Sequence, residues 1–450
     1  MGVGRWEEGA SPPPGLGARE FAAQILEAIR LGVVPAADLS VYTVGRAEEV
    51  ALVERDLDEV AARGGAVRAL LGDYGTGKTH MLELIQRRAL SRGFLVARAV
   101  LDARETAPSH PRRVYRALAR SLRYPDRPFE EGVGLSRLLE MGASSPSALA
   151  RFGAGRRGAS SVGDDEGEAP QAHLYLTPAL RIMGRLMDPK VGGALSPLAL
   201  RESRELLMGW IEGHPTISNQ SIDAELARGV GRQGRIYSLM DYRPWARIYA
   251  YLISGIAALA RSVGFGGLVV LLDEAEFYAL LSGENKAHAQ RQFKALTLAS
   301  VGAEGDVLPF DAEELDLGGY GVLRSLPAGF DAAAGLYTVL AMTPHGEGMS
   351  ALSAAVPSRC VRELAPLGRA HYEALAAQVC EVYGRAHPGW EAPPGIALAL
   401  ARVIAGLIGV GYVGNPRQAV KFIVEFLDVA RTHPGEVVRV VRDLQASLAF

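Results

Sequence analysis

The sequence predicts an α/β protein with a parallel sheet, followed by a small helical domain. Four short apolar runs have the residue types of buried strands: 66–72, 94–102, 268–274 and 335–343. A stretch of helical periodicity stands between the first and second runs, and this strand, helix, strand order is typical of a parallel sheet. From residue 366 onward the periodicity is helical to the end of the printed chain.

Length and composition narrow the class of protein. The 450 residues, 48% of them hydrophobic, are enough for two or three domains with real cores. The formal net charge of −2 argues against a chain that binds nucleic acid through its bulk charge. Cys360 and Cys380 give no framework of disulfides, and no run of about 18 uncharged apolar residues is present. We therefore expect a cytoplasmic protein without a membrane segment.

The apolar runs also predict where the domains begin and end. We expect an N-terminal segment and helix at 1–40, an α/β core at 41–365 and a helical lid domain at 366–450. The second and third runs are about 165 residues apart, more than one crossover needs, so we expect an insertion at about 125–240. Within it, 142–171 is rich in Gly, Ser and charge and is expected to form a mobile loop.

A glycine-rich motif follows the first apolar run. It fits the pattern G-x-x-x-x-G-K-[ST] with Gly72, Asp73, Tyr74, Gly75, Thr76, Gly77, Lys78 and Thr79. Glycines let backbone N–H groups turn inward around a phosphate, the lysine reaches the outer phosphates, and the threonine hydroxyl ligates Mg²⁺. The chain has only five lysines, so a chance match is improbable. The motif predicts a binding loop for ATP and Mg²⁺.

Acidic residues end the third apolar run. Asp273 and Glu274 follow Leu268–Leu272, at the end of the strand where ligands of open α/β sheets collect. We expect Asp273 to hold Mg²⁺ through its water shell and Glu274 to orient and deprotonate the attacking water. Glu276 either faces the same site or lies on the surface, and both interpretations stay open.

Two further residues are candidates for contact with the nucleotide. Thr343 ends the fourth apolar run and is expected to hydrogen-bond the attacking water or the γ-phosphate. The alternative is an ordinary turn before Pro344. Gly414-Asn415-Pro416-Arg417 opens a helix, with proline in the first turn where it is tolerated. Arg417 would then reach the nucleotide from the helical domain, and in isolation the tetrapeptide indicates only a helix start.

These motifs, in this order, resemble the AAA+ ATPase superfamily, specifically its initiator and loader-like branch. The resemblance implies that Gly45 and Arg46 lie near the adenine and that the Walker A loop runs from Gly72 to His80. It implies a Walker B role for Asp273 with Glu274, sensor 1 for Thr343 and sensor 2 for Arg417. Sensor 1 is often asparagine in these proteins and is threonine here. Arg359 stands where an arginine finger is often found, and Arg362 competes for that role.

A narrower resemblance is to the BREX-associated ATP-binding family, the BrxC/BrxD-type P-loop proteins of bacterial phage defence. It rests on AAQILEAIRLGVVP, LLGDYGTGKTHMLELIQRRAL, FLVARAVLDARETAPSHPRRVYRALARSL and GLVVLLDEAEFY. The resemblance implies a bacterial ATPase that works with DNA-processing proteins. As partners we expect further copies of this chain in a ring or filament, or defence proteins such as a helicase-like subunit, with DNA as another candidate.

Two classes of function share these residues. The first is an ATP-hydrolysing AAA+ protein that converts its nucleotide state into movement of the lid. The alternative is a slow, nucleotide-controlled switch or loader that closes on ATP and recruits an effector or DNA. A small-molecule kinase is disfavoured, because the acidic pair suits attack by water better than transfer to an acceptor.

A row of arginines follows the second apolar run. Arg113, Arg116, Arg120, Arg123 and Arg127 are spaced to share one helix face if the helix continues past Pro125, and the first four share it if the helix stops there. Such a row either tracks a phosphate backbone or contacts an acidic neighbour, or it is a solvated, ion-paired face. The general excess of arginine in this chain favours the solvated face.

Overall fold

The fold was obtained as a computed structural model. The structure describes residues 17–31, 43–128, 130, 132–154, 172–215, 217, 222, 224–226, 230, 231, 236–302, 308–315, 323, 324, 326–393, 395–437, 439 and 443. Most of the loop expected at 142–171 lies outside these residues, as do parts of the expected N-terminal segment. The chain divides into two compact units, one of Met1–Leu52, Gly72–Leu84 and Glu363–Phe450, the other of Val53–Leu71 and Ile85–Arg362.

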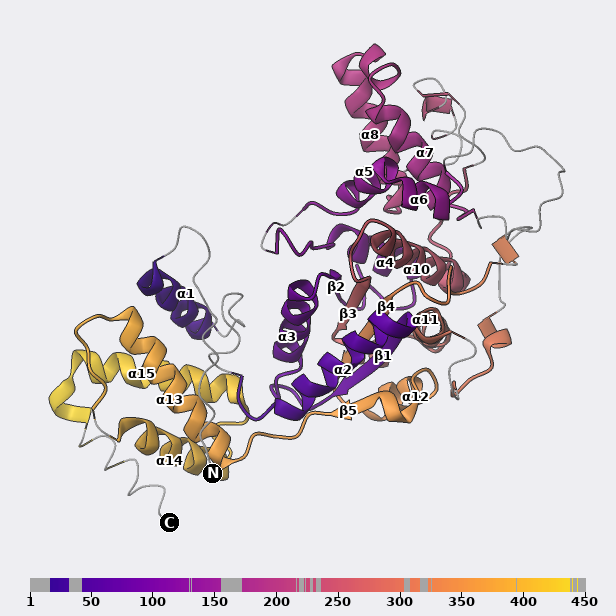
Figure 1. The fold of residues 1–450 in the computed structure, drawn as a ribbon. Helices are drawn as coiled ribbons and strands as arrows, with labels where there is room; N and C mark the ends of the chain where they lie inside the picture. Colours follow the sequence, from indigo (N-terminus) through magenta and orange to yellow (C-terminus); the bar gives the residue numbers. More distant parts are fainter. Residues whose placement is uncertain are drawn as a thin grey trace. The chain divides into compact units, whose positions relative to one another are not determined.

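A five-stranded sheet forms the centre of the second unit (Figure 1). Its strands are β1 (Gly65–Leu71), β2 (Leu95–Val100), β3 (Leu268–Asp273), β4 (Leu336–Met342) and β5 (Val361–Glu363), in the order β2-β3-β4-β1-β5. The pairs β2/β3, β3/β4 and β4/β1 are all parallel. This confirms the predicted α/β class and the strand character of all four apolar runs. The three-residue strand β5 is too short for a periodic signal and was not predicted.

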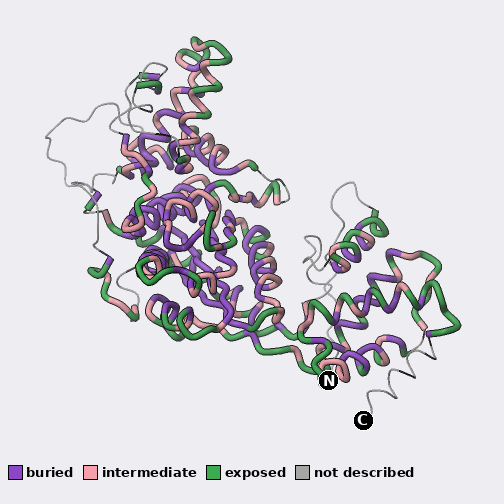
Figure 2. The backbone as a smooth tube through the Cα atoms, turned by 180° about the vertical axis from the view of Figure 1, so that it is seen from behind, coloured by how far each residue is buried: buried purple, intermediate pink, exposed green. Residues whose placement is uncertain are grey.

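Helices cover the sheet. α4 (Pro111–Arg120), α10 (Ala246–Ser262) and α11 (Gly283–Val301) lie beside its strands, and α12 (Gly346–Ser353) follows β4 (Figure 1). α10 is buried along most of its length, as the purple trace in Figure 2 shows for much of this unit. α2 (Ala47–Arg63) and α3 (Lys78–Ser91) each begin in the first unit and continue into the second.

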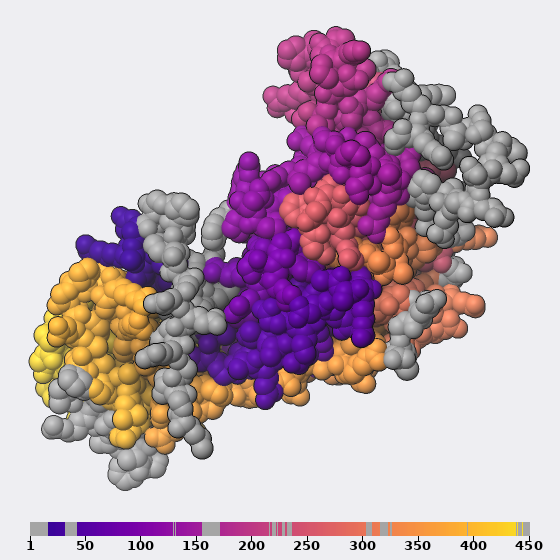
Figure 3. All heavy atoms as spheres, in the orientation of Figure 1, coloured from indigo at the N-terminus to yellow at the C-terminus, as the bar shows by residue number. Residues whose placement is uncertain are grey.

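A group of helices precedes α10 in the second unit. It comprises α5 (Ser136–Ser144), α6 (Pro146–Arg151), α7 (Leu176–Met187) and α8 (Pro197–Ile211). Figure 3 shows α8, in magenta, at the outer end of this group. Buried residues such as Leu139, Trp210 and Leu180 belong to the same hydrophobic cluster as the strands. The helices between β2 and β3 therefore share one core with the sheet.

A second hydrophobic cluster holds the first unit together. α1 (Ala18–Arg30), α13 (Arg369–Ala386), α14 (Ile396–Gly409) and α15 (Pro416–Thr432) all contribute to it. Arg30 forms an ion pair with Asp428 at 2.8 Å, and the Tyr383 hydroxyl donates to the same carboxylate at 2.7 Å. The N-terminal helix thus packs with the C-terminal helices. None of the helices among the described residues is both long and apolar enough to cross a membrane.

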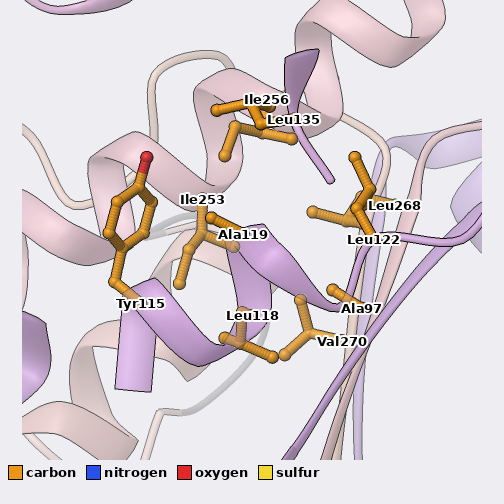
Figure 4. A pocket seen from close by; sticks show the side chains of 10 residues that line it. All are labelled: Ala97, Tyr115, Leu118, Ala119, Leu122, Leu135, Ile253, Ile256, Leu268 and Val270. Carbon is orange, nitrogen blue, oxygen red and sulfur yellow. The ribbon is translucent and has the colours of Figure 1, made fainter. Parts of the chain in front are cut away.

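A small cavity of about 10 Å³ lies between the sheet, α4 and α10 (Figure 4). Its lining is apolar and includes Ala97, Leu118, Ile253 and Val270. A space of this size is at the limit of what one water needs, and these side chains offer a water almost no polar partner. We interpret it as a packing gap rather than as a binding site.

Truncation at this gap tests how strongly the core depends on α10. We expect Ile253→Ala, which enlarges the cavity at a side chain that is 2% exposed, to lower the free energy of unfolding by about 2–5 kcal/mol. Urea unfolding followed by circular dichroism measures this change. Leu198→Ala is the control, because that leucine is 65% exposed on α8 and its truncation should change stability by about 0.5 kcal/mol or less. Equal losses in the two variants would contradict the assignment of the core.

Candidate functional site

The glycine-rich loop follows β1 directly and has a backbone that requires glycine. Gly75 has φ 82° and Gly77 has φ 102°, both in the left-handed region that other residues rarely adopt. The Thr76 N–H and hydroxyl both donate to the carbonyl oxygen of Asp73, at 3.2 and 2.9 Å, which closes a tight turn. Alternating turns of this kind aim successive backbone N–H groups to one side, and such a nest binds anions.

Lys78 is the first residue of α3 and is only 8% exposed. Its Nζ donates to the carbonyl oxygens of Gly72 at 2.8 Å and Asp73 at 3.3 Å, so the ammonium group is held against the first two residues of the loop. A cation is disfavoured at a helix N-terminus, where the helix dipole is positive, unless an anion is also present. Thr79, the second residue of the helix, is half-buried.

The segment before α2 contacts the loop. The Arg46 guanidinium, 6% exposed, donates to the carbonyl oxygen of Thr76 at 2.8 Å. The Thr43 hydroxyl and the His80 ring share a hydrogen bond of 2.7 Å. Gly45 has φ 66°, and a Cβ there would come within 2.7 Å of the His371 ring. The structure therefore brings Gly45, Arg46 and His80 together with the loop, and their contact with adenine stays a prediction.

The start of α15 also lies against the loop. Asn415 caps this helix by accepting the Gln418 N–H at 3.0 Å, and its side chain packs so closely on Gly75 that a Cβ there would overlap it. Sequence reasoning identified the helix start but not this contact. Arg417, the expected sensor 2 residue, is exposed and makes no hydrogen bond or ion pair with the residues that the structure describes.

Asp273 ends β3 and is 3% exposed. Its Oδ2 accepts a hydrogen bond from Nη2 of Arg98 on the neighbouring strand β2, at 2.9 Å. Its Oδ1 accepts the backbone N–H of Glu274 at 3.0 Å. Sequence reasoning missed Arg98. Glu274 has φ 60° and is the one non-glycine residue with positive φ in the described part of the chain. Backbone strain of this kind costs about 1–3 kcal/mol and is common at functional sites.

Thr343 and Glu276 meet at the end of β4. The Thr343 hydroxyl, in a residue 8% exposed, donates to Oε1 of Glu276. The second carboxylate oxygen, Oε2, is buried and has no hydrogen-bond partner among the residues described. Glu276 is thus directed toward the end of the neighbouring strand and not toward open solvent. Glu276 therefore does not simply lie on the surface, and the alternative that it faces the nucleotide site stays a prediction.

A buried ion pair braces the segment that carries Arg359. Arg68 of β1 binds the Asp56 carboxylate of α2 with a guanidinium fork, and the Tyr337 hydroxyl donates to the same carboxylate at 2.6 Å. Burial alone would lower the pKa of Arg68, but hydrogen bonding and the charge of Asp56 outweigh burial and raise it. The remaining Nη1 donates to the backbone oxygen of Arg359 at 3.3 Å. The side chain of Arg359 is exposed and that of Arg362 is half-buried.

Comparison with known proteins adds one finding. Residues 18–141 match the family model described as BREX system ATP-binding protein BrxC/D. This match confirms the predicted BrxC/BrxD-type resemblance. It includes the glycine-rich loop, Arg46 and β2 with Arg98, whereas Asp273, Glu274 and Arg359 lie outside it. No curated protein and no solved structure matches the chain.

Substitution of the loop glycines separates backbone strain from steric overlap. A Cβ at Gly77 meets no atom closer than 3.9 Å, so Gly77→Ala lowers the free energy of unfolding only through its positive φ, by about 1–2 kcal/mol. In Gly75→Ala the positive φ has a similar effect and the new Cβ also overlaps Asn415, so we expect a larger loss of stability. Adding Asn415→Gly should restore part of the stability of Gly75→Ala and none of that of Gly77→Ala. Thermal unfolding of the four variants measures this, and equal rescue of both alanine variants would contradict the Asn415 contact.

Proposed function

We propose that this BrxC/BrxD-type chain is a P-loop ATPase of the AAA+ type. The observation that carries the proposal is the glycine-rich loop at the end of β1, with its left-handed Gly75 and Gly77 and with Lys78 at the start of α3. Description of the matched family as an ATP-binding protein supports the same conclusion. The helices from 366 onward are proposed as a lid, with Arg417 as the residue that reaches the nucleotide.

The loop residues suit a triphosphate. Lys78 now donates to two loop carbonyls, and phosphate oxygens are stronger acceptors for an ammonium group in the same place. Arg46 stabilises the conformation of the loop by its hydrogen bond to the Thr76 carbonyl. The Thr79 hydroxyl and the Asp273 carboxylate are the hard oxygen donors that Mg²⁺ prefers. Mg²⁺, when bound with the nucleotide, offsets the charge of the phosphates.

The acids at the ends of the strands suit hydrolysis. Glu274 takes a proton from a water whose oxygen forms a bond to the γ-phosphorus, while the bond to the β–γ bridging oxygen breaks and ADP leaves. Lys78 and Arg417 offset the charge that develops on the phosphoryl oxygens. The Thr343 hydroxyl orients the attacking water by a hydrogen bond. Arg359, exposed on a braced segment, is proposed to act on the nucleotide of a second copy of this chain.

Separating binding from turnover tests the proposal. We expect Glu274→Gln to bind ATP as wild type does and to lose turnover by about 10²–10⁴, because the general base is gone while the loop is intact. Lys78→Ala should lose binding itself. Calorimetry with Mg²⁺ and ATP measures affinity, and phosphate release measures turnover. Glu284→Gln, which removes an exposed charge from the first turn of α11, is the control and should leave both unchanged. Wild-type turnover in Glu274→Gln would refute the role of that residue.

The match to the BREX family supports a place in a bacterial anti-phage system, alongside DNA-processing partners. We propose that the chain assembles as a ring or filament, or with a helicase-like subunit. If Arg359 completes a site in a second copy, assembly and turnover should depend on each other. We expect ATP to increase the mass of Glu274→Gln particles in light scattering, and Arg359→Ala to lower turnover by about 10³ without loss of ATP binding. Turnover that does not change with protein concentration in a monomeric sample would contradict this.

One observation favours the second candidate function, a slow nucleotide-controlled switch. Both carboxylate oxygens of Asp273 are already engaged, by Arg98 and by the Glu274 N–H. An aspartate held in this way must give up its charge-assisted hydrogen bond to Arg98 before it can hold Mg²⁺ beside the nucleotide. This exchange would slow each cycle of hydrolysis. If the chain is a slow switch, Arg98→Gln should speed turnover. If it is an ATPase that moves its lid in each cycle, turnover should fall, because the buried carboxylate loses its partner. Turnover of Arg98→Gln, with and without duplex DNA, decides between them.

A further inference from the structure

The arginine row predicted after β2 is shorter in the structure than in the sequence. α4 ends at Arg120, because the chain turns back and Arg123 pairs with Val96 of β2 in an antiparallel bridge. The helix therefore ends before both of the stops that the sequence left open, and only Arg113, Arg116 and Arg120 of the predicted row lie on it. Arg127, outside the helix, forms an ion pair with Glu130 at 3.0 Å. What remains on α4 is a row at every fourth position, Arg112, Arg116 and Arg120, with Arg113 beside it.

We call this region the α4 arginine surface. It consists of the four arginines of α4 and the ionisable groups around them: Arg112, Arg113, Arg116, Arg120, His110, Glu212, His214 and Asp241. All of these residues belong to the second unit.

Cations outnumber acids on this surface. The Asp241 carboxylate is shared by His110 at 3.1 Å, Arg113 at 3.0 Å and Arg112 at 3.4 Å. Arg116 and Arg120 form no hydrogen bond or ion pair with the residues that the structure describes, and Glu212 is the acid whose charge acts on both. Elsewhere arginines have carboxylates of their own, as in Arg137–Asp126, Arg151–Asp331 and Arg204–Glu140. Counting the described residues alone, four arginines here share two carboxylates.

The cationic groups lie close enough to repel one another. Partial burial lowers the pKa of Arg116, and the charges of Arg120 and Arg112 lower it further. Burial also lowers the pKa of His214, followed by the charges of Arg116, Arg120 and Arg112. Like charges held together and partly removed from water cost free energy, and an anion that binds between them offsets that cost.

We propose that the α4 arginine surface binds the phosphate backbone of a nucleic acid. An α-helix advances about 6 Å over four residues, so Arg116 and Arg120 place two cations one such step apart along a linear polyanion. Guanidinium groups bind phosphate oxygens in a bidentate manner, and Arg120 is exposed while Arg116 is half-exposed. Contacts to phosphates position a protein without reading sequence, so binding here is sequence-independent. The inference does not depend on the proposed ATPase.

The near-neutral composition of the whole chain does not oppose this inference. A formal net charge of −2 describes the sum over 450 residues, whereas attraction to a phosphate within a Debye length depends on the local charge. The sequence favoured a solvated, ion-paired face for the arginine row. The pairing of Arg113 and Arg127 fits that view, but the lack of an ion pair from Arg116 or Arg120 to any described residue does not.

Salt-dependent binding tests the proposal. Fluorescence anisotropy with a labelled duplex and a labelled single strand measures the affinity of wild type and of Arg116→Ala, Arg120→Ala and the double variant. Loss of one phosphate contact lowers the slope of log K against log salt by about 0.9 on duplex DNA, which is about fivefold in affinity at 0.15 M salt. The double variant should lose about 25-fold. Arg116→Lys should keep most of the slope, because the charge stays.

The controls separate this surface from general effects of charge. Arg201→Ala removes an exposed arginine that pairs with Glu205 on α8, and it should bind nucleic acid as wild type does. Unchanged thermal unfolding of the alanine variants shows that they are folded. The proposal is overturned if wild type binds neither nucleic acid, or if the double variant binds as tightly as wild type. It is also overturned if polyglutamate competes as well as DNA does, because the partner would then be an acidic protein.

Discussion

The carboxyl edge of the parallel sheet is the constraint on which the candidate site depends. Parallel strands all end at the same edge, and β4 lies between β1 and β3. Residues that follow two neighbouring strands are therefore delivered to one region of the second unit: Thr343 after β4 and the acids after β3. The bond from Thr343 to Glu276 joins the ends of these two strands. If β3 and β4 were not neighbours in the sheet, the residues that follow them would lie apart even with the same sequence.

Two ion pairs join elements of the second unit around the sheet. Arg68 with Asp56 holds β1 to α2, and Arg98 with Asp273 holds β2 to the end of β3. Pairs of this kind contribute little net stability, because removing ions from water is costly, but loss of one partner leaves an uncompensated charge. Their value here is geometric: each one holds a backbone segment that carries a candidate functional group, Arg359 in one case and Glu274 in the other. The strained φ of Glu274 persists because Asp273 accepts its N–H on one side and the η4 turn (Ala275–Leu280) follows on the other.

Local signals in the sequence were enough to predict the strands and the glycine-rich loop, because each is a short contiguous pattern. Leu268–Asp273 is a run of buried apolar side chains that ends in an acid, and Gly72–Thr79 is a motif in which every position has a physical role. Arg98 and Asn415 were beyond such reasoning. Arg98 meets Asp273 across 175 residues of chain, and Asn415 meets Gly75 only after the helices have packed. The end of α4 was missed for a similar reason, since the pairing of Arg123 with Val96 competes with the helix and cannot be read from helical periodicity.

The loop and the C-terminal helices belong to the same compact unit, and this has a consequence for either proposed function. Asn415 packs on Gly75, and His371 of α13 packs on Gly45, which precedes the arginine that bonds to the loop. Under the proposed function, a phosphate that reshapes the loop at Gly75 would press on the first turn of α15, and a shift of α15 would change the room available to the loop. α1, α13 and α14 share one core with α15, so a shift of α15 would also change the packing of these helices. Coupling of this kind would work in both directions: if the chain binds nucleotide and a partner binds these helices, each would change the affinity for the other by the same factor.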